Sequence, residues 1–112
     1  MRILSIGNSF SQDAQRWLHQ IAGAAGVDLT VKNLYIGGCT LETHWNNFES
    51  EAEAYAYETN GVTEDTPRSS IQAALREGGW DIITFQQQSG RAGRPETYMP
   101  YLEKLIEGVK SI

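Results

Sequence analysis

The chain has 112 residues, of which 40% are hydrophobic and 21% are charged, and this length suits one domain with one hydrophobic core. The formal net charge of −5 disfavours nucleic acid and anionic membranes as main partners, and no apolar run is long enough to cross a bilayer. The single cysteine, Cys39, excludes an internal disulfide and a multi-cysteine metal site.

The first quarter of the chain predicts a strand, a turn and a helix. Residues 2–6 are mainly apolar and are followed by Gly7, which is typical of a central strand buried on both faces. This start lacks the long apolar stretch and the cleavage site of a secretory signal, so we predict no signal peptide and leave the compartment open. After a turn over residues 7–11, Ser11 is expected to cap a helix over residues 12–25. One face of this helix carries Ala14, Trp17, Leu18, Ile21 and Ala25.

The next part of the chain predicts a second strand, a second helix and a hairpin. Residues 28–36 predict the strand, and Thr40 is expected to cap a helix that starts near Leu41. Within residues 54–67, an Asn-Gly pair at 60–61 separates a tyrosine-containing stretch from a second extended stretch, which indicates a hairpin. We interpret this hairpin as a small excursion from the main sheet.

The remaining residues predict another unit of helix, strand and helix. A serine at position 69 or 70 is expected to start a helix that runs through Leu75, and residues 81–85 predict a third buried strand. Residues 86–95 predict a polar loop, after which a last helix is expected to begin at position 96 or 97. Its apolar residues at helical spacing are Tyr98, Tyr101, Leu102, Leu105, Ile106 and Val109.

Strands and helices therefore alternate at least three times along the chain. This order predicts an α/β fold built on a parallel sheet with right-handed crossovers. We expect residues 1–112 to form a single domain, since the chain holds no internal repeat. A sheet of three parallel strands would leave long open edges, so we expect the domain to be partial and truncated after its third core strand and the following helix.

Three loops leave the carboxyl ends of the predicted strands, which is where α/β sheets bind their ligands. They span residues 7–11, 37–40 and 86–90, are rich in small or amide residues and contain no carboxylate, so they suit a developing oxyanion. Ser9 stands between a strand and a helix, a position that exposes a hydroxyl for attack on a carbonyl. The alternative is that Ser9 and its neighbours are only turn and cap residues.

The same loops carry a family resemblance. Residues 3–11, ILSIGNSFS, look like the first block of the SGNH/GDSL hydrolases, with Asn8 in place of the usual aspartate. Residues 33–40, NLYIGGCT, resemble the second block, and residues 83–90, ITFQQQSG, lie where the third block, Gly-x-Asn-Asp, should follow its strand. The chain thus resembles the N-terminal part of these hydrolases, within a poorly characterised bacterial subgroup. The resemblance implies a flavodoxin-like, three-layer fold.

The resemblance also implies roles for individual residues. Ser9 would be the nucleophile, and the backbone N–H groups of Ser9 and Gly38 would bind the oxyanion. Gln88 would add its side-chain amide, with Gln87 as the other choice. The final block of the family, Asp-x-x-His, supplies the base and does not occur in this sequence. We expect His44 to be a substrate-side or helix-surface residue rather than that base.

The leading hypothesis is a serine-dependent ester hydrolase that acts on a small-molecule ester or an acetylated sugar, with no cofactor and no metal. The alternative is a non-catalytic domain that binds a carbohydrate or another small polar ligand. Aromatic residues that would suit such a ligand are Trp45, Tyr55, Tyr57 and Tyr98. A third interpretation, a flavodoxin-like module that binds phosphate at residues 7–11, lacks a glycine-rich or P-loop lysine motif. The oligomeric state stays open.

Overall fold

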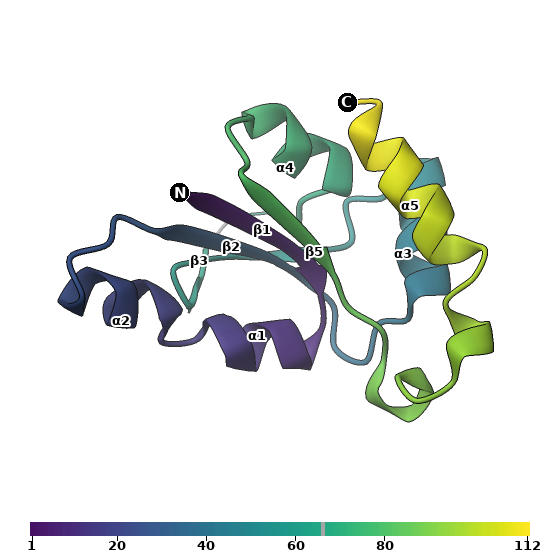
Figure 1. Cartoon of the computed structure of the whole chain (residues 1–112). Helices are drawn as coiled ribbons and strands as arrows, with labels where there is room; N and C mark the ends of the chain where they lie inside the picture. Colours follow the sequence, from purple (N-terminus) through teal and green to yellow (C-terminus); the bar gives the residue numbers. More distant parts are fainter. Residues whose placement is uncertain (66) are drawn as a thin grey trace.

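The computed structural model describes residues 1–65 and 67–112, which form an α/β fold around one five-stranded sheet (Figure 1). The strands are β1 (Arg2–Gly7), β2 (Thr30–Tyr35), β3 (Ala56–Thr59), β4 (Val62–Thr63) and β5 (Ile82–Phe85), in the spatial order β4-β3-β2-β1-β5. The helices are α1 (Ser9–Gln15), α2 (Leu18–Ala24), α3 (Leu41–Ser50), α4 (Ile71–Glu77) and α5 (Tyr101–Lys110). Helices α1 and α2 lie on one side of the sheet, and α3 and α5 lie side by side on the other (Figure 1).

The two faces of the sheet differ in chemistry because side chains alternate along each strand. Leu4 and Ile6 of β1 are completely buried and join Leu34 of β2 in the hydrophobic core. Ser5, between them, points to the opposite face, where its hydroxyl accepts a hydrogen bond from Gln15 of α1. The apolar core therefore lies on one face of the sheet, and α1 packs on a polar face.

The α/β class is confirmed, but the sheet is mixed rather than parallel throughout. β1 pairs in parallel with β2 and with β5, whereas β3 pairs antiparallel with β2. The hairpin at Asn60 and Gly61 is confirmed, and both residues have the positive φ angles, 53° and 84°, that a tight hairpin turn needs. Its interpretation as an excursion is wrong, because β3 and β4 extend the main sheet at one edge.

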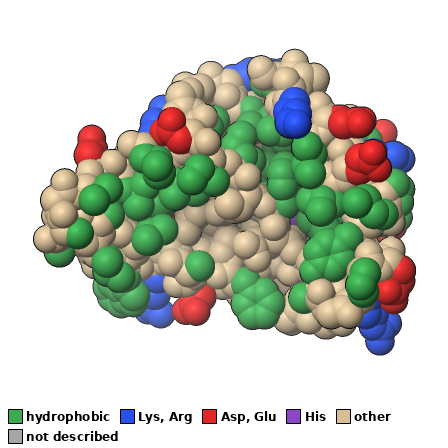
Figure 2. All heavy atoms as spheres, in the orientation of Figure 1, with side chains coloured by type: hydrophobic (Ala, Val, Ile, Leu, Met, Phe, Trp, Pro, Cys, Tyr) green, Lys and Arg blue, Asp and Glu red, His purple; other side chains and the backbone are tan. Residues whose placement is uncertain are grey.

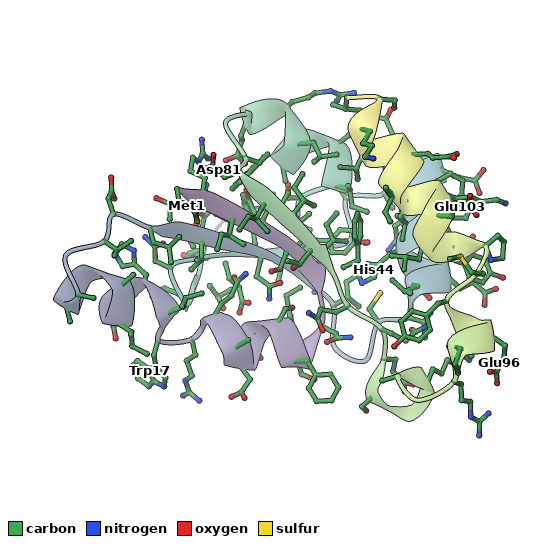
Figure 3. All side chains as sticks on the ribbon, viewed as in Figure 1. Met1, Trp17, His44, Asp81, Glu96 and Glu103 are labelled. Carbon is green, nitrogen blue, oxygen red and sulfur yellow. The ribbon has the colours of Figure 1, made fainter. Side chains whose placement is uncertain are left out.

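The helix expected over residues 12–25 is two helices. Asn8, not Ser11, is the N-cap of α1, so the helix begins at Ser9. The helix is interrupted at Arg16 and Trp17, after which α2 begins. The expected apolar face is also wrong, since Trp17 is 57% exposed and Ile21 is 63% exposed. Trp17 points away from the sheet (Figure 3), and hydrophobic side chains gather on the surface over α2 (Figure 2).

From α3 onward, the order of the elements agrees with the sequence-based prediction, but their details differ. Thr40 and Ser70 cap α3 and α4 as expected. β5 lies at an edge of the sheet, with Ile82 43% exposed, and is not the buried strand that its composition indicates. The last helix begins at Tyr101 rather than at position 96 or 97, after a 3-10 helix (Pro95–Thr97) and Pro100, which favours a helix start. No helix in the described part of the chain meets the length and hydropathy of a membrane span.

Candidate functional site

The side chain of Asn8 joins the three loops at the carboxyl ends of the parallel strands. β1 lies between β2 and β5, so the loops that leave these strands are neighbours. The Asn8 side-chain amide donates to the carbonyl of Cys39 in the second loop, at 3.2 Å, and to that of Gln87 in the third loop, at 3.0 Å. Asn8 is 2% exposed, so these bonds are shielded from water. The predicted convergence of the three loops is therefore present, and one side chain holds it.

Asn8 also fixes the position of Ser9. Its side-chain oxygen accepts from the Phe10 N–H, at 3.0 Å, and its own N–H donates to the Ser11 hydroxyl, at 3.1 Å, which completes a capping box. Ser9 is consequently the first residue of α1, and its side chain is exposed. Among the described residues, no group forms a hydrogen bond with the Ser9 hydroxyl. The turn-and-cap alternative thus holds for Asn8 and Ser11 but leaves Ser9 with no structural bond.

A row of polar residues crosses all five strands beneath α1. The strand register places these residues opposite one another, and we call them the polar row: Thr84, Ser5, Asn33, Glu58 and Thr63. Three side chains of α1 bind this row. Gln15 donates to Ser5, Ser11 donates to Asn33 at 2.9 Å, and Gln12 donates to Glu58 at 2.7 Å. α1 is therefore held on the sheet by hydrogen bonds, which fix the position of Ser9 at the start of this helix.

Glu58 is the charged member of the polar row and is only 5% exposed. Its carboxylate accepts from the amide of Asn33, at 2.7 Å, as well as from Gln12 and from the Thr63 hydroxyl, at 3.3 Å. No lysine or arginine of the described chain forms an ion pair with it. Sequence reasoning missed Glu58 and Asn33. The available signal was a carboxylate that alternates with Tyr57 in a strand, which places it on the face opposite the core.

The other two predicted oxyanion residues lie on the loops that Asn8 joins. Gly38 is exposed in a turn with a φ of 66°, a conformation that favours glycine. Gln88 is half-buried, and its side-chain amide has no hydrogen-bond partner in the residues described. Gln87 is buried and fully engaged, because its oxygen accepts from the Leu41 N–H, at 3.1 Å, and its nitrogen donates to the Thr97 carbonyl, at 3.1 Å. Gln88, and not Gln87, is therefore free to bind a ligand.

His44 is not at the surface, contrary to the sequence-based expectation. It shares the inner face of α3 with Leu41 and has no exposed area (Figure 3). Its Nδ1 lies 2.8 Å from the Tyr55 hydroxyl and 3.5 Å from the Cys39 sulfur. Burial lowers the pKa of His44 to about 4, so the ring is neutral at pH 7. His44 is a core residue whose Nδ1 bonds to Tyr55, and its buried Nε2 has no hydrogen-bond partner among the described residues.

The other histidine is also engaged elsewhere. The His19 ring contacts the carbonyl of Leu29, which lies just before β2 and hence at the amino end of the parallel strands. Ser9 follows the carboxyl end of β1, so the two residues lie at opposite ends of the parallel strands. Two of the expected ligand-stacking aromatics, Tyr55 and Tyr57, are buried as well, with 0% and 7% exposure, and cannot stack on a ligand.

Ser9 lies at one end of a cavity of about 510 Å³ between α1 and the β3–β4 hairpin, which we call the α1 groove. Its α1 wall consists of Ser9, Gln12, Asp13 and Arg16, and its hairpin wall consists of Glu58, Gly61 and Thr63. A second cavity of about 370 Å³ lies beside the open edge of β5 and against α5, and it is lined mainly by apolar side chains. Within the described residues, no three potential metal ligands cluster.

Residues 2–112 match the family model called DUF4886, a domain of unknown function. The chain belongs to the DUF4886 family. This DUF4886 chain is similar in structure to the crystal structure of a DUF4886 family protein from Bacteroides uniformis ATCC 8492, with a TM-score of 0.91 and 36% sequence identity. The likeness covers 99% of the present chain but 44% of that chain, so the present chain spans less than half of its solved relative. No curated protein matches the sequence.

Proposed function

We propose that this DUF4886 chain forms the N-terminal part of a serine-dependent ester hydrolase with Ser9 as the nucleophile. The observation that carries this proposal is the pair of Asn8 bonds to Cys39 and Gln87. They bring an exposed serine, free of structural bonds, together with two loops that offer hydrogen-bond donors. The resemblance of the same loops to the blocks of SGNH/GDSL hydrolases supports this proposal.

In the proposed reaction, the Ser9 hydroxyl oxygen attacks the carbonyl carbon of an ester while a base takes its proton. The backbone N–H groups of Ser9 and Gly38 and the side-chain amide of Gln88 donate to the oxyanion that develops. Collapse of the tetrahedral intermediate returns the carbonyl, transfers the proton to the alcohol and leaves the acyl group on Ser9. Water then releases the acid by the same steps. No metal or cofactor takes part in this scheme.

The base is the group that the described residues do not provide. His44 is buried and bonded to Tyr55. His19 lies at the amino end of the parallel strands, and Ser9 lies at their carboxyl end. We therefore assign the base to a histidine with an orienting aspartate in a segment that follows Ile112. The solved relative is long enough for such a segment, since the present chain covers 44% of it.

The open edge of β5 also supports the proposal that a segment after Ile112 completes the domain. Among the described residues, β5 pairs only with β1, and its other edge borders the apolar cavity formed with α5. Trp80, Ile83 and Phe85 contribute to that cavity from the β5 side, and Ile106 and Val109 contribute from α5. An open edge of this kind presents unpaired backbone N–H and C=O groups and is prone to pair with another strand. We infer that a further strand, connected through α5, pairs with β5 and completes the sheet.

The second candidate function is a binding domain without catalysis. The observation that favours it is the α1 groove, a polar cavity next to a serine that has no available base among the described residues. A small polar ligand would occupy this groove whether or not Ser9 reacts. This candidate predicts binding that survives Ser9→Ala.

Labelling with a fluorophosphonate tests the hydrolase proposal. The probe is applied at neutral pH to a longer natural DUF4886 protein that contains this chain, and intact mass reports the adduct. We expect labelling that Ser9→Ala abolishes and that Ser89→Ala, a matched change at an exposed serine in the third loop, leaves intact. Because a general base contributes on the order of 100-fold or more, the 112-residue chain alone should react far more slowly. A longer protein that takes up no probe at Ser9 would overturn the proposal.

A further inference from the structure

The α1 groove has a defined length and direction. Its α1 wall is formed by residues 9, 12, 13 and 16, which share one side of the helix because their spacing follows the helical repeat. Ser9 stands at one end and Arg16 at the other. Seven residues at the helical rise separate these ends by about 10 Å. The groove therefore runs from the proposed nucleophile along α1, and the hairpin closes its other side.

Every side chain that lines the groove carries a polar group. It contains the hydroxyls of Ser9 and Thr63, the amide of Gln12, the carboxylates of Asp13 and Glu58 and the guanidinium of Arg16, with Gly61 as the one residue without a side chain. No aliphatic or aromatic side chain is part of it. A long acyl chain would gain little apolar contact there and would dehydrate these polar groups, which is unfavourable. The groove is therefore not an acyl-chain site.

The charged side chains of the α1 groove restrict the class of ligand that it can bind. Two carboxylates, Asp13 and Glu58, face one guanidinium, that of Arg16, so a phosphate or another strong anion meets net repulsion. Glu58 is fixed by its bonds to Gln12 and Asn33, which hold its oxygens in place as acceptors. Asp13 and the Gln12 side-chain oxygen add acceptors, and Arg16 adds donors. Closely spaced acceptors and donors of this kind match the vicinal hydroxyls of a sugar.

We propose that the α1 groove is a saccharide-binding site, and that it holds an uncharged segment of about two sugar rings, which matches its length of about 10 Å. This deepens the proposed function, because it places the hydroxyl-rich alcohol part of the ester in the groove and the acyl group at the Ser9 end. Binding itself does not require Ser9 to react. Glu58 and Asp13 are the specificity-determining residues of this site.

Two-dimensional NMR of a ¹⁵N-labelled longer natural DUF4886 protein that contains this chain tests this proposal, with cellobiose as the probe. We expect dose-dependent shifts of the backbone amides of Gln12, Gly61 and Thr63, with a dissociation constant on the order of 1–10 mM, as is usual for few contacts. Octanoate and glucose 6-phosphate serve as the acyl-chain and anionic comparisons. Neither should shift these amides at the same concentration.

Two variants test the named residues. Asp13→Asn changes an exposed side chain that forms no hydrogen bond in the described structure. It should weaken binding about fivefold, since a hydrogen bond to a charged acceptor is replaced by a weaker one to a neutral acceptor. Glu58→Gln should weaken it further. Its spectrum first shows whether the fold is retained, and if it is not, Asp13→Asn alone decides. Glu103→Gln, on the exposed side of α5 (Figure 3), should bind as the unmodified chain does.

The outcomes separate this proposal from the hydrolase proposal. Absence of shifts up to about 50 mM cellobiose, a concentration well above the expected constant, overturns the saccharide site, as do shifts confined to the cavity beside β5. Octanoate binding in the groove overturns it as well. Cellobiose binding without Ser9 labelling in the longer protein supports the site and refutes the hydrolase. Labelling without cellobiose binding supports the hydrolase and places its substrate elsewhere.

Discussion

Asn8→Asp is the substitution that tests most directly how the three loops are held together. The change keeps the size of the side chain and keeps an oxygen that can cap α1, as Asn8 does through the Phe10 N–H. It removes only the amide hydrogens that Asn8 donates to the Cys39 and Gln87 carbonyls. The family that the sequence resembles usually has aspartate at this position, so a tolerant outcome is the natural expectation from sequence alone.

The structure predicts instead a clear loss of stability. Two carbonyls that Asn8 satisfies at 3.2 and 3.0 Å would lose their donor and face a carboxylate oxygen, in a place where Asn8 is 2% exposed. Each unsatisfied buried acceptor costs on the order of 1–2 kcal/mol, so we expect the free energy of unfolding to fall by about 3 kcal/mol at neutral pH. Burial and the two carbonyl oxygens would raise the pKa of the new carboxyl group.

The pH dependence gives this prediction a second readout. A carboxyl group with a raised pKa binds its proton more readily in the folded state than in the unfolded state. Once protonated, it can donate one hydrogen bond again. The stability deficit of Asn8→Asp relative to the unmodified chain should therefore shrink as the pH falls toward about 5.

Urea denaturation, followed by circular dichroism at both pH values, measures the difference. Asn46→Asp, the same change at an exposed position of α3, is the control and should lie within about 0.5 kcal/mol of the unmodified chain. If Asn8→Asp behaves like this control at neutral pH, Asn8 does not hold the loops as described.

Two further predictions concern the stability of the fold, at a core histidine and at the hairpin turn. The pKa of His44 is lowered from 6.5 to about 4 in the folded state, so the unfolded state binds more protons between these two pH values. The free energy of unfolding should therefore fall by up to about 3 kcal/mol as the pH drops from 6.5 to about 4. In His44→Gln this part of the pH dependence should vanish. The prediction is contradicted if urea denaturation gives the same pH dependence of the free energy of unfolding for His44→Gln and for the unmodified chain. Gly61→Ala should destabilise by about 2 kcal/mol, because φ is 84° and the added Cβ would lie 2.3 Å from the Arg16 carbonyl oxygen. Thermal melts should show the opposite sign for Gly23→Ala in α2, where the added Cβ meets no atom within 4 Å.

Local features of the fold could be predicted from the sequence because they depend on neighbouring residues. Thr40 and Ser70 cap helices through bonds that reach only three residues along the chain. The Asn-Gly pair at 60–61 makes its turn because both residues tolerate a positive φ. The same locality explains why the order of strands and helices was predicted correctly while the cap of the first helix was not. Asn8, Ser9 and Ser11 are all good cap residues, and only the structure shows which one is used.

Burial was the main error, since it depends on what an element packs against. Trp17 and Ile21 form an apolar face at helical spacing, yet α2 has no buried residue, and nothing in the described chain covers that face. His44 lies in a helix that is polar elsewhere, yet α3 turns it into the core against Tyr55. A helical pattern identifies which residues share a face but not which face meets the sheet.

What the sequence determined by itself is the α/β class, the three loops at the carboxyl ends of the strands and the placement of Ser9 between a strand and a helix. Only the tertiary structure decided which amide is free, Gln88 rather than Gln87, and that Glu58 borders the groove beside Ser9. It also showed that the hairpin belongs to the sheet, which is what brings Glu58 opposite Asn33. The free amide of Gln88 and the position of Glu58 depend on strand register and on hydrogen bonds between residues 25 or more positions apart. Such pairings cannot be predicted from local sequence patterns.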